Sequence, residues 1–595
     1  MPNPRRSRRR LALAIAVVFA VVGVFAVRLV DIQLVRADQL TSDALSKRSV
    51  ATSTYADRGD IVDTNGVVLA DTVNRYDVTV SPANFAKMDA VGGFRVSAKD
   101  GTKTTVTVTQ AATELAALTK QDPATVYQSL VKNPTSNYAL VTKSVDLATR
   151  RAIEKLRIPG IVFQLHPKRV YPNGAVAGNL TGYMNTGGPG GGLEVTEKKC
   201  LASIDGSSTY EQGGDGVQIP GSAVTTKASV PGGTLKLAID SDLDWFSTQA
   251  IAEQGTAIGA QSGTAIVLRI KDFHIMAAAD WPAVDPNNID GSAVPNFGSL
   301  AFTAAYEPGS VFKAMSAAIL LDSGIGSPTM QATVPSRWTT PEGGFVRDAI
   351  AHPTQQLTLT GVLQNSSNVG ISMLGSKVPQ DVRLAYMKKF GLGQKTAVDF
   401  LGEATGSLGA SGSATKPWDN QSKYNVLYGQ GVSATALQVA QIFGTLGNGG
   451  VKLPMTLVQS CTRADGSVTD VPSTTGARVV SESTAKTVVN MLESVVQAGE
   501  LSKAVKIPGY RVAGKSGTAE VAASGGYTSD RIVSFAGIAP AEDPQYVVVV
   551  TYTKPATMKS SAAAAPTFKK IMSQVLTKYR VPPSTTPSTY PATTW

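Results

Sequence analysis

The chain has 595 residues, with 55 Lys and Arg against 44 Asp and Glu, and therefore a formal net charge of +11. Two cysteines exclude a disulfide-rich scaffold, a Cys-rich zinc site and an iron–sulfur protein, and three histidines without metal-ligand spacing predict no metal and no other cofactor. Five of the excess positive charges lie within the first ten residues, which leaves +6 for the rest, so a nucleic-acid partner is not indicated.

An apolar stretch follows the basic cluster directly. Residues 11–27 (LALAIAVVFAVVGVFAV) are seventeen residues without a charge, which as a helix just spans a bilayer. The alternative is a cleaved signal peptide, but its apolar stretch is usually about 7–15 residues and ends in a small-x-small site, which residues 25–30 do not offer. We expect an uncleaved single-pass anchor over residues 11–30. The positive-inside rule then places the basic tail (1–10) in the cytoplasm and the following residues outside the cell membrane.

The region after the anchor shows mixed α and β patterns. Residues 61–70 form two short apolar runs around Asn65-Gly66, which is typical of a β-hairpin. Residues 71–230 alternate strand-like and helix-like stretches and offer no convergent cluster of reactive side chains. We expect an irregular α/β pedestal domain over residues 31–234.

The pattern changes at residues 231–233 (PGG), where a second domain begins. Strand patterns occur near both ends of this domain, at residues 263–270, 274–279, 532–538 and 546–552. Helix patterns lie between these two groups of strands and after the last one. One sheet built from both ends is the simplest interpretation, so we expect an α+β domain over residues 235–580. Residues 581–595 are rich in Pro and Thr and are expected to be disordered.

The chemistry of this second domain begins at residues 307–313 (EPGSVFK). A Pro-Gly turn brings Ser310 to the start of an apolar helix, where Lys313 shares its face. A serine hydroxyl is a weak nucleophile until a base takes its proton, and a desolvated, neutral amine can serve as that base. The pair is therefore suited to acyl transfer.

Ser-x-x-Lys alone carries little information, because residues 483–486 (STAK) repeat it within a plain amphipathic helix pattern. There we expect Ser483 to cap the helix and the lysine to be solvated. Two further motifs distinguish the first copy: residues 366–368 (SSN) and residues 515–518 (KSGT), in that order. Glycine at the third position of the last motif would let a substrate backbone approach a strand.

These motifs resemble those of the penicillin-recognising serine acyltransferases, and the chain as a whole is most similar to the monofunctional class B penicillin-binding proteins. The similarity extends over nearly the whole length, including residues 58–66 (RGDIVDTNG), 428–438 (YGQGVSATALQ) and 534–540 (SFAGIAP). It implies an N-terminal transmembrane helix, a dimerisation-type pedestal, and a penicillin-binding transpeptidase domain with an antiparallel sheet flanked by helices.

The resemblance also implies residue roles. The catalytic group would be Ser310, Lys313, Ser366 and Asn368, and the substrate-binding group Lys515, Ser516, Gly517 and Thr518. Ser310 would be acylated, Lys313 would act as its base and Ser366 as a proton shuttle. Asn368 would hold the substrate amide, and Lys515 and Thr518 the terminal carboxylate of a D-Ala-D-Ala stem peptide. The backbone N–H groups of Ser310 and Thr518 would form the oxyanion hole.

The implied function is peptidoglycan D,D-transpeptidation in septal cell-wall synthesis, inhibited covalently by β-lactams. An elongation-type enzyme and a mainly scaffolding or sensing protein remain as alternatives, although intact motifs favour an enzyme. The expected partners are stem-peptide donors, β-lactams, a membrane glycan polymerase and other division proteins. For Cys200 and Cys461, two independent buried thiols are expected rather than a disulfide.

Overall fold

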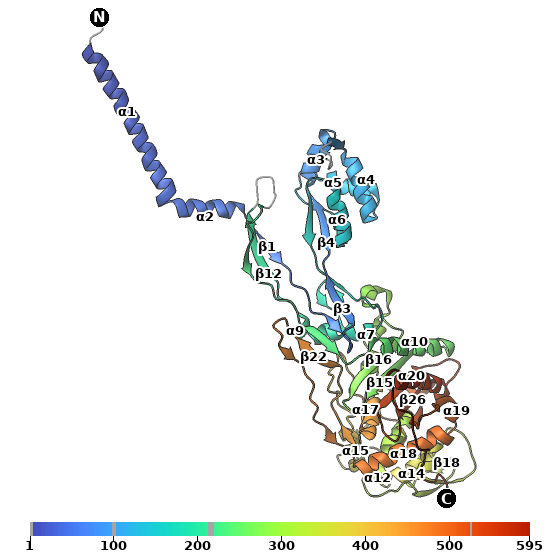
Figure 1. Cartoon of the computed structure of the whole chain (residues 1–595). Coiled ribbons are helices and arrows are strands. Elements are labelled where there is room, and N and C mark those ends of the chain that lie inside the picture. Colours follow the sequence, from blue (N-terminus) through green and yellow to red (C-terminus); the bar gives the residue numbers. More distant parts are fainter. Residues whose placement is uncertain (1–3, 98–102, 212–218, 524–525) are drawn as a thin grey trace. The chain divides into compact units, whose positions relative to one another are not determined.

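The computed structural model describes residues 4–97, 103–211, 219–523 and 526–595, and its contacts divide the chain into two compact units (Figure 1). The smaller unit consists of residues 1–57 and 203–231, of which residues 1–3 and 212–218 lie outside the described residues. It contains α1 (Pro4–Val30), a π-helical turn η1 (Asp31–Val35), α2 (Ala37–Arg48) and a sheet of β1 (Ser49–Thr54), β12 (Gly206–Glu211) and β13 (Val224–Lys227).

Among the described residues, one helix is long and apolar enough to cross a membrane. It covers Arg6–Val35 and contains an 18-residue stretch with a mean hydropathy of 2.7, whose side chains are not buried inside the protein. Because a bilayer is the solvent in which such a surface is stable, this helix agrees with the expected anchor.

The larger unit begins with the pedestal sheet, which has the strand order β23-β22-β14-β2-β3-β9. These strands are β2 (Ile61–Val62), β3 (Val68–Val73), β9 (Lys168–Val170), β14 (Thr234–Leu237), β22 (Val458–Thr462) and β23 (Val468–Thr469). The predicted hairpin is the β2–β3 pair: Gly66 takes φ +87°, and Asp63 Oδ1 accepts hydrogen bonds from the N–H groups of Asn65 and Val67. The expected domain boundary after residue 234 falls inside β14.

A second pedestal layer has its own core. It consists of a three-stranded sheet, a hairpin and four helices: β4 (Tyr76–Val80), β7 (Ala139–Val145), β8 (Ile161–Leu165), β5 (Phe94–Ser97), β6 (Lys103–Val106), α3 (Pro82–Ala90), α4 (Val108–Thr119), α5 (Pro123–Val131) and α6 (Leu147–Lys155). Three short helices and a two-stranded ribbon complete the pedestal: α7 (Gly178–Thr181), α8 (Gly192–Thr196), α9 (Lys198–Leu201), β10 (Met184–Asn185) and β11 (Gly188–Pro189). At its base Glu194, fully buried, contacts both Arg58 and Arg169.

The two cysteines form a disulfide, with Cα atoms 6.0 Å apart, so the expectation of independent thiols is wrong. The cysteines are 261 residues apart in sequence, but α9 carries Cys200 beside β14, and β22 carries Cys461 as the antiparallel neighbour of the same strand. Gly233 leaves room for both sulfur atoms, because a Cβ at this position would lie 2.8 Å from Cys461 Sγ and 3.2 Å from Cys200 Sγ. Only the three-dimensional pairing of β14 with β22 reveals this proximity.

The second domain is built on an antiparallel sheet of order β16-β15-β27-β26-β25, with strands from both ends of the domain as predicted. The strands are β15 (Ser262–Arg269), β16 (His274–Trp281), β25 (Ala513–Ala523), β26 (Gly526–Ala539) and β27 (Tyr546–Thr553). Alternate residues of β27 enter two different cores: Val548 and Val550 pack with α10 (Ser241–Ala257) and α20 (Ala565–Lys578), whereas Val547 and Val549 face the other helices.

Those other helices surround the three motifs. They are α11 (Leu300–Thr303), α12 (Lys313–Asp322), α13 (Leu359–Gln364), α14 (Asn368–Gly375), α15 (Gln380–Lys389), α16 (Ser422–Asn425), α17 (Ala436–Gly447) and α18 (Glu482–Ala498). The short helix α19 (Ser502–Val505) packs with α20 instead, in the core that contains Val548 and Val550. Short strands accompany them: β17 (Gln331–Val334), β18 (Arg337–Thr339), β19 (Phe345–Arg347), β20 (Gln355–Thr358), β21 (Val451–Lys452) and β24 (Ala477–Arg478). In the described part of the domain there are also five 3₁₀ turns: η2 (Pro286–Gly291), η3 (Val294–Asn296), η4 (Gly309–Phe312), η5 (Val426–Tyr428) and η6 (Ser561–Ala563).

The Pro/Thr-rich segment after residue 580 differs from the expected disorder. It leaves α20, follows the surface of the second domain and ends beside β20, where Leu357 and Thr594 form a β-bridge. Its hydroxyl and carbonyl groups find fixed partners on the domain, which composition alone does not reveal.

Candidate active site

The turn that carries Ser310 is held by close backbone packing. Gly309 adopts φ +60° and donates a hydrogen bond to the carbonyl of Gly429 at 3.0 Å. A Cβ on Gly309 would lie 2.7 Å from the carbonyl oxygen of Thr518, so only glycine fits between these two segments. Ser310 lies in the 3₁₀ turn η4, and the predicted apolar helix is α12, which begins three residues later at Lys313.

Lys313 is the centre of the site. Its side chain is fully buried, and its Nζ atom lies 2.9 Å from Ser310 Oγ. The same nitrogen donates to the Ser366 carbonyl at 2.5 Å and to Asn368 Oδ1 at 2.7 Å, and lies 3.3 Å from Ser366 Oγ. A neutral amine has two N–H groups and one lone pair. With the two hydrogens directed to the two shortest acceptors, the lone pair faces the Ser310 hydroxyl.

Electrostatics favour this neutral state. Burial lowers the pKa of Lys313 well below its usual value, and the nearby charge of Lys515 lowers it further, while Asp348 opposes the shift. The arrangement therefore favours an unprotonated amine beside a serine hydroxyl, which is what a general base requires.

Ser366 connects the two lysines of the site. Its Oγ atom accepts a hydrogen bond from Lys515 Nζ at 2.9 Å and lies 3.3 Å from Lys313 Nζ. Ser366 adopts φ +56°, a backbone conformation that non-glycine residues rarely take. This strained position sends its hydroxyl between the two amines, where it can pass a proton in either direction.

The third motif lies on β25, next to the nucleophile turn. Lys515 is fully buried, and burial lowers its pKa to about 7. Lys515 Nζ also contacts the carbonyl and hydroxyl of Ser516, whereas Thr518 is exposed and its Oγ1 accepts from the N–H of Ser561 at 3.1 Å. A Cβ on Gly517 would lie 2.4 Å from Ser534 Oγ and 3.0 Å from the backbone carbonyl oxygen of Pro308, so the close packing at this position favours glycine.

The structure thus brings all eight predicted residues into one site, on η4, α12, the α13–α14 junction and β25. The copy at residues 483–486 lies elsewhere: Ser483 is exposed, and Lys486 pairs with Glu482 at the surface. The cap of that helix is Ser481, whose hydroxyl accepts from the N–H of Thr484, and not Ser483 as predicted.

Asp348 is a part of the site that the sequence motifs do not indicate. Its Oδ1 atom accepts from the backbone N–H groups of Asn368 at 2.5 Å and Val369 at 2.9 Å, at the N-terminus of α14. Its Oδ2 atom accepts from Ser367 Oγ at 2.7 Å and lies 2.9 Å from His352 Nε2. Asp348 therefore fixes the backbone of the second motif directly beneath Lys313.

His352 closes this network. Burial disfavours its charged form, but the Pro353 carbonyl and the carboxylate of Asp348 outweigh burial and raise the pKa of His352. An Asp followed four residues later by His, before a Ser-Ser-Asn motif, would be the sequence signal to search for, but without the fold the pair resembles many other loop residues.

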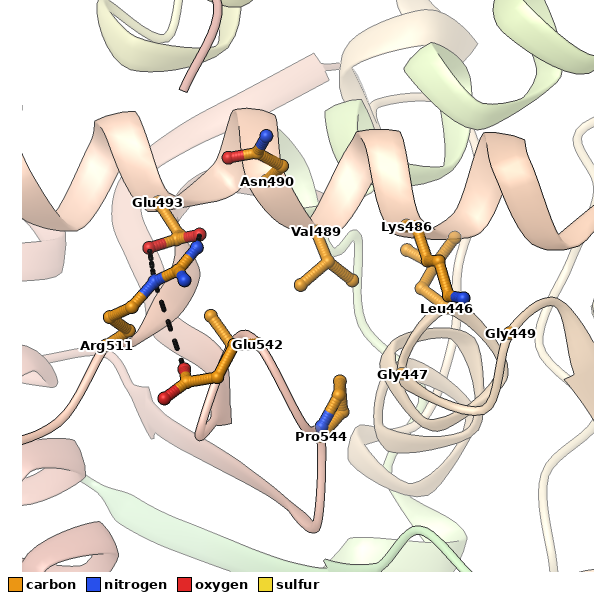
Figure 2. Close-up of a pocket in the computed structure, with 11 residues that line it drawn as sticks. Leu446, Gly447, Gly449, Lys486, Val489, Asn490, Glu493, Arg511, Glu542 and Pro544 are labelled. Atoms are coloured by element: carbon orange, nitrogen blue, oxygen red, sulfur yellow. Dashed lines mark hydrogen bonds and ion pairs between the residues drawn. The ribbon is translucent and has the colours of Figure 1, made fainter. Parts of the chain in front are cut away.

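A cavity of about 230 Å³ lies apart from the motifs. It is lined by α17, α18 and the β26–β27 turn, and the ion pair of buried Glu493 and half-buried Arg511 lies at one end (Figure 2). Within the described ranges, the structure holds no group of three His, Cys, Asp or Glu side chains that could bind a metal ion.

Comparison with known families gives two matches. Residues 263–573 match the penicillin binding protein transpeptidase domain, and residues 53–237 match the penicillin-binding protein dimerisation domain. The chain is 35% identical to the penicillin-binding protein PbpB of Mycolicibacterium smegmatis, over 96% of this chain and 90% of the relative. It is 31% identical to the peptidoglycan D,D-transpeptidase FtsI of Escherichia coli, over 76% of this chain and 74% of the relative.

A solved structure shares the same architecture. Penicillin binding protein 3 from Mycobacterium tuberculosis, complexed with aztreonam, matches with a TM-score of 0.67 and 27% identity, covering 91% of this chain and all of that chain. The similarity therefore includes the pedestal as well as the domain with the three motifs.

Proposed function

Because this chain belongs to the class B penicillin-binding proteins of the division type, we propose that it cross-links peptidoglycan as a D,D-transpeptidase during septal cell-wall synthesis, through an acyl-enzyme on Ser310. The relatives with division-type names favour this role over elongation. The observation that supports the mechanism best is the contact between Ser310 Oγ and the buried Nζ of Lys313 at 2.9 Å.

In the first half-reaction, Ser310 Oγ attacks the carbonyl carbon of the penultimate D-Ala of a stem peptide. Lys313 accepts the hydroxyl proton as the O–C bond forms. The C–N bond to the terminal D-Ala then breaks, and the proton passes to the leaving amine, with Ser366 as the relay between the two lysines. The products are an ester on Ser310 and free D-Ala.

In the second half-reaction, an amine of another stem peptide attacks the ester carbonyl. The new amide bond forms, the bond to Ser310 Oγ breaks, and the proton lost by the amine returns to the serine through Lys313. Asn368 would hold the donor's amide, and charged Lys515 with Thr518 would hold the terminal carboxylate. The backbone N–H groups of Ser310 and Thr518 would stabilise the oxyanion.

A β-lactam would enter the same path, because its strained amide takes the place of the D-Ala-D-Ala bond and its carboxylate that of the terminal carboxylate. The N-terminal helix would anchor the enzyme as a single-pass protein, with the basic tail in the cytoplasm and the catalytic domain outside. A membrane glycan polymerase and other division proteins would supply and organise the strands that it cross-links.

The test of this function is cross-linking by the purified, detergent-solubilised chain. Uncross-linked glycan strands with D-Ala-D-Ala stem peptides are incubated with the wild type, Ser310→Ala and Ser483→Ala, and dimeric muropeptides are quantified by mass spectrometry. We expect product from the wild type and from Ser483→Ala only. Cross-linking by a folded Ser310→Ala protein would contradict the proposed nucleophile.

A further inference from the structure

The segment after α20 joins two elements that carry active-site motifs. Residues 584–594, called the strap here, contact the approach to β25 at one end and the start of α13 at the other. β25 carries Lys515, and α13 ends two residues before Ser366. These two side chains are in direct contact across the site. The strap therefore contacts the chain segments that lead into both partners of that contact.

The first attachment is at Arg511, four residues before Lys515. Ser584 accepts from the N–H of Arg511 at 2.8 Å and donates its own N–H to the carbonyl of Gly509 at 2.9 Å. The guanidinium of Arg511 donates to Thr586 Oγ1 at 3.0 Å. These contacts fix the backbone that leads into β25.

The buried pair of Figure 2 supports this attachment. Glu493 on α18 is 1% exposed and accepts two hydrogen bonds from Arg511, at 2.9 and 2.5 Å. Ser588 of the strap donates to the same carboxylate at 2.6 Å. A charge-assisted network of this kind is stronger than the same number of neutral hydrogen bonds. The network therefore connects the strap both to α18 and to the residues that lead into β25.

The second attachment is the N-cap of α13. The hydroxyl of Thr358 accepts from the N–H of Gly361 at 3.1 Å and donates its single proton to the carbonyl of Ala592 at 2.5 Å. The N–H of Thr358 donates to the carbonyl of Thr593 at 3.1 Å. Since a hydroxyl has only one proton, the strap determines how the capping side chain is oriented.

Gly361 shows how tightly the strap lies against α13. A Cβ on this residue would be 1.9 Å from the carbonyl oxygen of Thr593, which is a backbone atom that has no rotamer to move. The other atom nearby is Leu357 Cδ2 at 3.3 Å, which belongs to a side chain. The glycine is thus explained by the strap and not by α13 itself, where alanine would be the better helix former.

We propose that the strap is a positioning element of the active site: by holding the start of α13 and the approach to β25, it sets the distance between Ser366 and Lys515. The inference rests on the proposed function of these two residues in acylation. A misplacement of about 1 Å in a catalytic contact reduces rates by as much as about 100-fold, so a loss of about ten-fold is expected when the strap is removed.

The experiment compares four forms of the detergent-solubilised chain: wild type, a truncation after residue 584, Gly361→Ala, and both changes together. Acylation by a fluorescent penicillin is followed over a range of concentrations, which separates the maximal acylation rate from half-saturation, and thermal unfolding is recorded alongside. A truncation that removes only Trp595 is the matched control, since this exposed residue follows the last bridge.

We expect the longer truncation and Gly361→Ala each to lower the maximal rate about ten-fold with little change in half-saturation, while the control stays at the wild-type rate. In the truncated chain Gly361→Ala should have no further effect, because the carbonyl that it displaces is absent. Equal losses from Gly361→Ala in both backgrounds, or a truncation that changes only thermal stability, would overturn the proposal. A wild type that is not acylated would instead contradict the proposed function.

Discussion

Replacing Asp348 by Asn tests how far the second motif depends on the carboxylate beneath it. In the wild type, Asp348 Oδ1 accepts from the backbone N–H groups of Asn368 and Val369, and the amide oxygen of the variant can still accept these two hydrogen bonds. In the wild type, Oδ2 accepts from Ser367 Oγ and contacts His352, and in the variant an NH₂ group takes its place. The shape of the side chain is kept while one negative charge is lost.

The expected magnitude follows from these four contacts. A hydrogen bond to a charged group contributes about 1.5–3 kcal/mol and a neutral one about 0.5–1.5 kcal/mol. Weakening two retained contacts and disturbing two others should reduce stability by about 2–3 kcal/mol. If about half of this loss appears as a higher activation free energy for acylation, acylation slows about ten-fold.

The charge of Asp348 also raises the pKa of Lys313, so its removal lowers that pKa further. Lys313 acts in its neutral form, and a lower pKa makes it neutral at lower pH. The rising part of the acylation pH profile should therefore shift to lower pH in Asp348→Asn. A purely structural role for Asp348 predicts a lower rate at every pH without this shift.

The assay is stopped-flow acylation of the detergent-solubilised chain by a fluorescent penicillin between pH 5 and 9. Asp399→Asn is the matched control, because it removes a carboxylate from an exposed ion pair with Lys395. An unchanged rate and pH profile in Asp348→Asn would refute the positioning role. The same outcome would show that Ser367 and the helix backbone suffice to place Asn368.

Three further predictions concern the lysines and the disulfide. Arginine in Lys313→Arg can carry the positive charge but has no neutral form near pH 7. Acylation measured by gel fluorescence should therefore fall about 10²–10⁴-fold, while thermal unfolding changes little. Near-normal acylation would mean that another group takes the proton. Burial lowers the pKa of Lys515 to about 7, so it loses its positive charge as pH rises through that value, and acylation by a carboxylated β-lactam should decline. In Lys515→Arg this decline should move to higher pH, and a decline that stays in place would assign it to a different group. Cys461→Ser removes the disulfide between α9 and β22, and we expect the free energy of unfolding to fall by about 2–5 kcal/mol. Equal unfolding midpoints in the wild type and the variant would contradict a structural role of the disulfide.

Much of the fold could be predicted because it depends on local patterns. The anchor is a continuous apolar run, the β2–β3 hairpin depends on Asn65 and Gly66, and the strands of the central sheet are short apolar runs at both ends of the domain. The pairings of β14 with β2 and with β22 could not be predicted in this way. Such long-range pairing leaves no mark in the local sequence.

The three motifs identify the side chains that meet at Lys313, since each motif combines unusual residue types within a few positions. Asp348 and His352 could not be identified, because a lone carboxylate and a lone histidine in a loop are more often solvated. Their roles arise only when β19 ends against the N-terminus of α14, which gives the carboxylate two backbone N–H groups to bind. Composition likewise predicts disorder for residues 581–595. In the structure, hydrogen bonds to Arg511 and Glu493 hold this segment against the domain, and composition does not reveal them.

The most direct test of the account is the position of the covalent adduct formed with penicillin. The detergent-solubilised chain is treated with benzylpenicillin, digested and sequenced by tandem mass spectrometry. The buried contact of Lys313 with Ser310, and the exposure of Ser483 beside a surface lysine, predict a single adduct on Ser310. An adduct on Ser483, or a folded chain that forms no adduct, would contradict the central claim.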